Sequence, residues 1–371
     1  MRAIPPEESQ GGKKSVPINF GAAQWRVGLK KRKILLGSLW LVIVTGLAFP
    51  AAPAPGELVA KLPQVLNPFF ITIADGRLYI VENSSTAHIY TIGAKGVAFV
   101  KTFGRAGQGP GEFDFMYLIR VFKDHLDIPG SNKLARFSLD GEYINEVKFP
   151  ISVFKGGIYR LGQNFVTRDF QFNDKGATTT IRLSDKDFKL IKEIGARKTA
   201  MGLEKLNLVA DYFSPRVVGD QIFIISSGRE SVVAVYDRNG IRQKEIRLPL
   251  EPVRMMAALK EAIIKPIRED RERMTSWQEY EKRLFFPDQT PGLDYFDVIE
   301  GKFVARTYKY RQDSVEFVIF DQQGRELRRA ALPFTGRISN GILFCFYQGR
   351  YFYLRENAGE EIWELHSEKV W

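Results

Sequence analysis

The chain has 371 residues, of which 44% are hydrophobic and 13% aromatic, and a formal net charge of +11. This composition predicts a globular core, and the 28 Phe and 14 Tyr favour pleated sheets over helices. The one cysteine, Cys345, excludes an intrachain disulfide and a cysteine-based metal site, and we interpret it as a small buried apolar residue.

The charge is concentrated at the N-terminus. Eight Lys/Arg and two Glu precede Pro53, which leaves 46 basic (54 − 8) and 41 acidic (43 − 2) residues in the rest, a net charge of +5. Such a mildly basic body has no dense basic stripe, so nucleic acid is not an expected partner.

Residues 1–33 form a polar, basic leader that ends in Lys30-Lys31-Arg32-Lys33. An apolar run, residues 34–49, and small residues up to Ala54 follow, an order typical of a secretory signal peptide over residues 34–54. The alternative is a retained anchor over residues 34–49, because this run approaches the shortest membrane span of about 17 residues. Both interpretations predict export of the body to the periplasm or the cell exterior.

From residue 57 onward the sequence reads as short strands separated by turns. Four such strands are expected between residues 69 and 103. A segment with a strand end, an Asp, a turn and an alternating strand then recurs at residues 138–150, 183–195, 235–249 and 319–333. The strand ends near Phe103, Phe149, Ile194, Leu248 and Leu332 are 46, 45, 54 and 84 residues apart. A period of about 40–50 residues with four strands each predicts a β-propeller.

The longest interval contains an insertion with helical periodicity, residues 250–286. The expected apolar faces consist of Val253, Met256, Ile263 and Ile267, and of Met274, Trp277, Tyr280 and Leu284. We expect this insertion to pack on the propeller; the alternative is a lid or docking surface that presents Met255, Met256, Trp277 and Phe285.

The last repeat lacks its fourth strand. Residues 350–371 match residues 77–98, and the chain then ends, whereas residues 58–62 form a strand with no neighbouring partner in sequence. We therefore predict that the N-terminal strand completes the last blade. The expected fold is all-β, a monomeric six-bladed propeller over residues 57–371 with four antiparallel strands per blade.

A glycine-rich stretch, TFGRAGQGPGEF, joins the first two repeats at residues 102–113. Its pattern comprises Phe103, Gly104, Gly107, Gly109, Pro110, Gly111 and Phe113. This pattern resembles the inter-blade signature of NHL-type six-bladed propellers, and the chain is most similar in character to secreted bacterial propellers of unassigned activity. A phosphate-binding loop is not predicted, because a Gly-Lys-Ser/Thr element and a following helix are missing. The polar residues Arg105, Gln108 and Glu112 could still face a ligand at the rim.

Some of the propellers that this chain resembles are metal-dependent enzymes. The resemblance would place metal-binding histidines or carboxylates around the centre, but His88, His125 and His366 all fall outside the expected innermost strands. Glu82-Asn83 and Glu356-Asn357 are best interpreted as polar hairpin turns. No cofactor is predicted, and Ca²⁺ or Mg²⁺ enters only under the alternative of a lactonase- or lyase-like enzyme.

The innermost strands can be aligned on the first apolar residue of each following strand. Six positions earlier stand Thr72, Arg120, Tyr159, Arg216, Asp297 and Cys345. Because side chains alternate along a strand, this column faces away from its mostly apolar neighbours, and we expect it to face the central channel. Arginine binds carboxylate or phosphate in a bidentate manner. An alternative is a water-filled channel whose Arg and Asp side chains pair with each other.

The preferred functional prediction is an exported binding or interaction module. Its expected partner is an anionic or sugar-like small molecule, a glycan or a protein, bound at a central funnel that contains Thr72, Arg120, Tyr159, Arg216 and Asp297. The competing prediction is the metal-dependent lactonase- or lyase-like enzyme, for which no catalytic residue can be named.

Overall fold

The computed structural model describes residues 56–149, 153–173, 176–199, 206–209, 211–228, 230–272, 277–311, 313–334 and 342–371. The predicted leader and signal peptide, residues 1–54, lie outside these ranges. Among the described residues no helix has the length and apolar character needed to cross a membrane.

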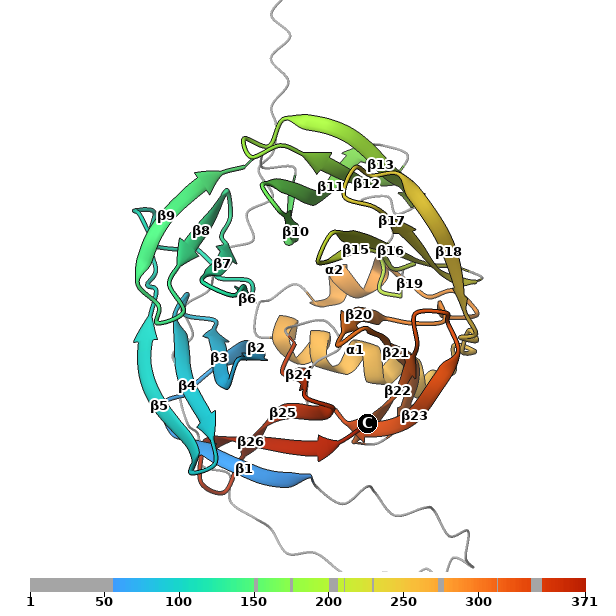
Figure 1. Cartoon of the computed structure of the whole chain (residues 1–371). Helices are drawn as coiled ribbons and strands as arrows, with labels where there is room; N and C mark the ends of the chain where they lie inside the picture. The colour runs from blue at the N-terminus through green and yellow to red at the C-terminus, as the bar shows by residue number, and fades with distance from the viewer. Residues whose placement is uncertain are drawn as a thin grey trace, which may run out of the picture. The chain divides into compact units, whose positions relative to one another are not determined.

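Six four-stranded antiparallel sheets in the described residues surround one axis (Figure 1). The strands of blades one to three, from inner to outer, are β2 (Pro68–Ala74), β3 (Arg77–Glu82), β4 (Ala87–Gly93), β5 (Gly96–Phe103); β6 (Arg120–Val121), β7 (Leu126–Pro129), β8 (Lys133–Phe137), β9 (Tyr143–Lys148); β10 (Val153–Leu161), β11 (Asn164–Asn173), β12 (Gly176–Ser184), β13 (Leu190–Thr199). Those of blades four to six are β15 (Phe213–Val218), β16 (Gln221–Ser227), β17 (Ser231–Tyr236), β18 (Arg242–Leu248); β20 (Tyr295–Ile299), β21 (Lys302–Arg311), β22 (Ser314–Phe320), β23 (Glu326–Pro333); β24 (Phe344–Tyr347), β25 (Arg350–Asn357), β26 (Ile362–Lys369), β1 (Glu57–Leu62). The body of the protein is a six-bladed β-propeller, as predicted.

The hairpin between the third and fourth strands follows the recurring sequence pattern. In blade four, the Asp237 carboxylate accepts hydrogen bonds from the backbone N–H groups of Asn239 and Ile241, both at 2.9 Å. Asp185 and Asp321 make the same pair of bonds in blades three and five. An Asp side chain can thus close a turn by binding its own backbone.

Blade two uses a serine at the equivalent position. The Ser138 hydroxyl accepts from the backbone N–H groups of Asp140 and Glu142, at 3.2 and 3.1 Å. Asp140, the Asp of the sequence pattern in this blade, lies two positions later and pairs with Arg77 instead.

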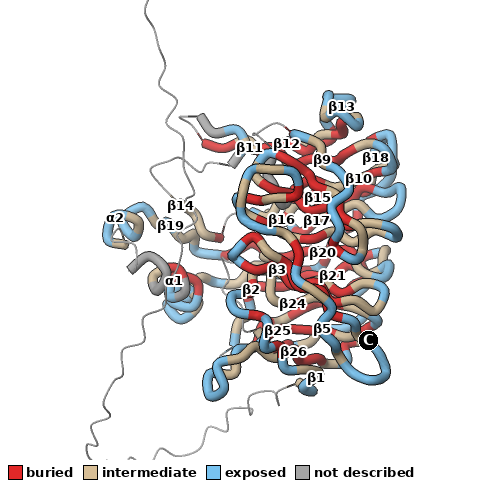
Figure 2. Tube along the Cα trace, turned by 90° about the vertical axis from the view of Figure 1, so that its left-hand side faces the viewer, coloured by how far each residue is buried: buried red, intermediate tan, exposed pale blue. Residues whose placement is uncertain are grey.

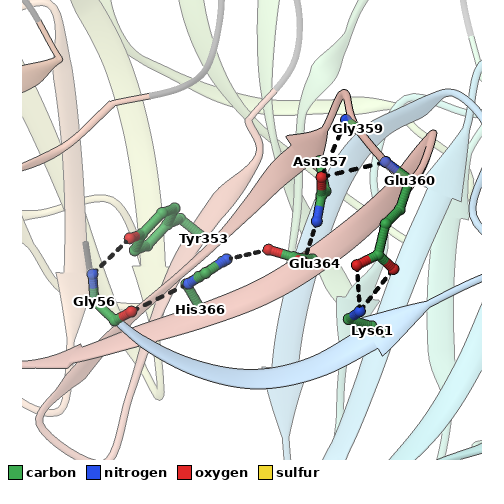
Figure 3. Close-up of polar contacts among 8 residues, drawn as sticks. All are labelled: Gly56, Lys61, Tyr353, Asn357, Gly359, Glu360, Glu364 and His366. Carbon is green, nitrogen blue, oxygen red and sulfur yellow. Dashed lines mark hydrogen bonds and ion pairs between the residues drawn. The ribbon is translucent and has the colours of Figure 1, made fainter.

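The N-terminal strand closes the ring, as the incomplete last repeat predicted. β1 pairs antiparallel with β26, and Leu62 at its end is 1% exposed. Figure 3 shows the polar contacts at this junction: the Gly56 N–H donates to the Tyr353 hydroxyl at 3.1 Å, and the His366 Nδ1 lies 3.1 Å from the Gly56 carbonyl oxygen. The His366 Nε2 contacts Glu364 at 2.9 Å, so the imidazole links the closing strand to its neighbour.

The core consists of apolar layers between neighbouring blades. One layer joins blades one and two through Tyr79, Phe113 and Phe137, all at most 3% exposed. Figure 2 shows buried segments through the middle of the ring and exposed segments along its outer strands. Burial between consecutive blades is the main force that holds a propeller together.

The predicted helical insertion contains α1 (Ala257–Glu272) and α2 (Trp277–Lys282) and lies on one face of the propeller (Figure 2). β14 (Leu206–Asn207), from the connection between blades three and four, pairs in parallel with β19 (Leu284–Phe285) of the insertion. We call this side the insertion face. The connections into all inner strands share it, because a blade of four antiparallel strands ends on the face where it began.

The insertion packs against blade five. Ile263 is buried with Val209 and Tyr308, and Met255 lies at the edge of this cluster. Ile263 and Ile267 therefore form the expected apolar face of α1. Met256, which was expected on the same face, precedes the helix and is 64% exposed, so that assignment was wrong. Met274 lies outside the described residues.

Candidate functional site

The aligned column of the sequence lies at one level of the six inner strands. Each of its residues pairs with the residue seven positions later in the second strand of its blade. The pairs are Thr72↔Tyr79, Arg120↔Asp127, Tyr159↔Val166, Arg216↔Phe223, Asp297↔Val304 and Cys345↔Phe352. The six side chains therefore sit at equivalent heights around the axis.

Four of these residues contact one another in a chain through blades two to five. The Arg120 guanidinium lies 4.0 Å from the centroid of the Tyr159 ring. The Tyr159 hydroxyl accepts from the Arg216 Nη1 at 2.7 Å, and the Arg216 Nε donates to Asp297 Oδ1 at 3.0 Å. The inner strands β6, β10, β15 and β20 that carry them are neighbours around the centre in Figure 1.

Thr72 and Cys345 occupy the same level on blades one and six. Cys345 is half-buried at the edge of an apolar cluster between these blades, and burial raises the pKa of its thiol. This environment agrees with a small apolar role for the cysteine, and a thiol with a raised pKa is a poor nucleophile.

Arg216 is the centre of the chain of contacts. Besides Tyr159 and Asp297, its guanidinium donates to the Tyr212 hydroxyl at 2.9 Å, to the Ser214 hydroxyl at 3.1 Å and to the carbonyl oxygens of Pro215 and Phe296. A guanidinium has five N–H donors, so Arg216 is fully engaged within the protein. Its side chain is 12% exposed, and it joins blades three, four and five.

Three further residues complete what we call the axial cluster, which comprises Arg120, Tyr159, Arg168, Tyr212, Arg216, Tyr295 and Asp297. Tyr295 donates from its hydroxyl to Asp297 Oδ2 at 3.1 Å. Arg168, on the second strand of blade three, donates to the Phe213 carbonyl oxygen at 3.3 Å. Tyr212 and Tyr295 precede column residues by four and two positions, so strand alternation could have found them. Arg168 is on a different strand and had no such signal.

The axial cluster is cationic. Its three arginines face one carboxylate, Asp297, so the formal charge is +2 with neutral tyrosines. Burial and the nearby Arg216 charge lower the pKa of both Arg120 and Arg168. The pKa of Arg216 is raised: burial alone would lower it, but the adjacent Tyr159, Tyr212 and Asp297 outweigh that effect. The Asp297 side chain is 34% exposed, so solvent reaches the cluster.

Tyr159 is expected to titrate earlier than an ordinary tyrosine. Burial would raise the pKa of its phenol, but the charges of Arg216 and Arg120 outweigh burial and lower it below 10. In a titration followed by the ultraviolet absorbance of tyrosinate, Tyr159→Phe should remove the first phenol to ionise. Tyr295→Phe is the matched control, since burial and Asp297 raise the pKa of Tyr295 well above 10. An unchanged first step in Tyr159→Phe would contradict this assignment.

Glu112 is the polar residue of the glycine-rich junction that is held within the turn. The Glu112 carboxylate accepts from the Gly109 N–H at 2.9 Å and pairs with Arg105 at 2.5 Å. The hydrogen bond from Gly109 is the largest cause of the lowered pKa of Glu112. Arg105, whose side chain is 77% exposed, lies at the surface, and Gln108 sits within the same turn. Phe113 is fully buried between blades one and two, so the junction has a clear structural role.

Gly104→Ala should destabilise the propeller by more than about 1 kcal/mol, because alanine adopts a positive φ only at a cost in free energy. Gly104 has φ +75°, and an added Cβ would lie 2.8 Å from the Met116 side chain and 3.1 Å from the Ser85 carbonyl oxygen. Gly93→Ala is the matched control, because nothing lies within 4 Å of its added Cβ. Chemical denaturation of both variants measures the difference; equal midpoints would refute the packing argument.

The three histidines lie outside the axial cluster and serve local contacts. His88 contacts Thr102 and Glu82, His125 contacts Asp124, and His366 belongs to the ring closure. Across the described ranges, His, Cys, Asp and Glu side chains form no group of three or more that could hold a metal ion. Glu82 accepts from the N–H groups of Leu66 and Asn67, both at 2.8 Å, and Asn357 accepts from the N–H groups of its own turn.

Some residues named for the alternative, a lid or docking surface, are exposed on the insertion. Phe285 is 49% exposed, and Trp277 is half-buried with the Arg268 guanidinium 5.6 Å from its ring.

One comparison with known proteins agrees with the observed architecture. A family model described as a six-bladed β-propeller matches residues 65–208, which contain the first three blades. No curated protein matches the chain. Among solved structures, the computationally designed Ika8 protein has a TM-score of 0.37 at 8% identity, covering 84% of this chain and 100% of that one. The AfRom2 CNH domain has a TM-score of 0.37 at 9% identity, covering 85% and 99%. The NHL-type character of the glycine junction stays a prediction.

Proposed function

We propose that this protein is an exported binding module whose ligand carries an anionic group held at the axial cluster. Export rests on the order of charged, apolar and small residues before residue 55. The proposed binding site rests on one observation. Arg120, Arg168 and Arg216 converge on a solvent-accessible cluster that contains one carboxylate.

An excess of positive charge at a partly buried site favours binding of an anion. Arginines near one another repel, and burial adds a desolvation cost, so an anion that enters the cluster relieves both effects. We assign the ligand contact to Arg120, beside the Tyr159 ring, and to Arg168, beside the Phe213 carbonyl oxygen, because burial and the Arg216 charge disfavour both cations and an anion would offset this. Arg216 holds the surrounding side chains in place.

Calorimetric titration with gluconate, citrate and a neutral sugar tests this function. The anions should bind and the neutral sugar should not, and affinity should fall with rising salt. Arg120→Gln and Arg168→Gln should each weaken binding at least tenfold. Arg238→Gln is the matched control, because Arg238 is 64% exposed and lies at the outer rim of blade four.

Thermal unfolding of the same variants separates lost binding from lost folding. A folded Arg120→Gln protein that binds the anions as tightly as the wild type would overturn the site. Failure of every anion to bind the wild-type protein would overturn the function.

A further inference from the structure

An aromatic patch lies on the insertion face, at the start of β2 and in the connection that leads to Arg120. It consists of Phe69, Phe115 and Tyr117, all half-buried. The rings of Phe69 and Phe115 are 5.0 Å apart edge to face, and those of Phe115 and Tyr117 are 4.6 Å apart. Half-buried aromatic rings that already contact each other offer a rigid apolar surface with one side open.

The chain places this patch close to the axis. Phe69 lies near the start of the inner strand β2, and its carbonyl oxygen accepts from the Ile342 N–H at 3.0 Å, which joins blades six and one. Phe115 and Tyr117 follow the glycine junction and lead into the inner strand β6. β24, β2 and β6 are neighbours around the centre in Figure 1.

Arg120 follows Tyr117 by three residues, which can span at most about 10 Å. The chain therefore brings two chemically different groups close to each other: the cationic axial cluster of blades two to five, and the aromatic patch at the insertion-face end of β2 and on the approach to β6.

We propose that the ligand is an amphipathic carboxylate, an organic acid with an apolar body. Its carboxylate binds at Arg120 and Arg168, and its apolar body lies on Phe69, Phe115 and Tyr117. This inference rests on the proposed function and names the class of anion. A fully hydrophilic anion would leave the aromatic patch in water, whereas an apolar body of up to about 10 Å would cover it.

The test is a calorimetric series of acetate, butyrate, hexanoate and octanoate with the full chain. Affinity should rise with each methylene that reaches the patch, by up to about fourfold per methylene. Octanoate should bind at least tenfold more tightly than gluconate, which carries the same charge. Octanamide, which has the same apolar body without the charge, should bind at least tenfold more weakly than octanoate.

Phe115→Ala should reduce the gain in affinity per methylene, so that octanoate loses more affinity than acetate. Phe99→Ala is the matched control, since Phe99 is a 41% exposed phenylalanine on the outer strand β5. The wild-type series decides the question even where Phe115→Ala fails to fold. If affinity does not rise from acetate to octanoate while gluconate still binds, the amphipathic ligand is overturned and the proposed anion site stands. Equal binding of octanamide and octanoate also overturns it, and no binding of any anion removes the proposed function itself.

Discussion

The Arg216→Met variant is expected to unfold about 10 °C below the wild type. Arg216 donates to groups in blades three, four and five, and methionine would remove its hydrogen bonds to Asp297, Tyr159 and a carbonyl oxygen. Removal of one partner from a fully buried charge pair costs roughly 3–5 kcal/mol, and the 34% exposure of Asp297 places this pair at the lower end of that range. In a domain of this size each kcal/mol shifts the midpoint by about 2–4 °C.

Differential scanning fluorimetry measures this effect, with Arg238→Met as the control. The Arg238 side chain is 64% exposed and lies 4.0 Å from Asp220, so its loss should change the midpoint by less than about 2 °C. A shift for Arg216→Met as small as that of the control would show that the axial cluster does not hold the three blades together.

Leu62→Ala is expected to destabilise the propeller by about 2–5 kcal/mol, the range for a buried Leu→Ala change. Leu62 is 1% exposed at the end of β1, where the closing strand meets Leu354 and Leu365 in the core between blades six and one. The cavity would weaken the attachment of the strand that joins the two ends of the ring.

Leu58→Ala in the same strand provides the control, because Leu58 is 48% exposed and its loss should cost less than about 0.5 kcal/mol. Urea denaturation gives the free energies of unfolding, and limited proteolysis reports release of β1. Equal destabilisation by the two substitutions would contradict a closure based on burial.

The aligned column of the six inner strands was predicted from the sequence. Alternation and the recurring blade period were enough to align Thr72, Arg120, Tyr159, Arg216, Asp297 and Cys345, and all six occupy one level of the ring. The sequence did not reveal that the Arg216 guanidinium donates its hydrogen bonds to protein groups, because these acceptors come from three blades. Arg168 was also missed, because it lies on the second strand of blade three and its contact with the Phe213 carbonyl oxygen depends on how blades three and four pack.

The insertion gives a second example. Helical periodicity located Ile263 and Ile267 on the packed face of α1, but it also assigned Met256 to that face, and the helix begins one residue later. Nothing local in residues 206–207 indicated that they pair with residues 284–285, since a parallel pairing of two residues leaves no periodic pattern.

The sequence by itself determined the six blades, their turns, the closing strand and the polar column, because each depends on patterns within one repeat or on a repeat left incomplete. Only the tertiary structure decided which polar groups meet. It joined Arg120, Arg168 and Arg216 into one cationic cluster, turned Glu112 inward to hold the glycine junction, and set Phe69 against Phe115. The physical reason is that these contacts cross from one blade to the next, so they depend on how whole sheets pack around the axis.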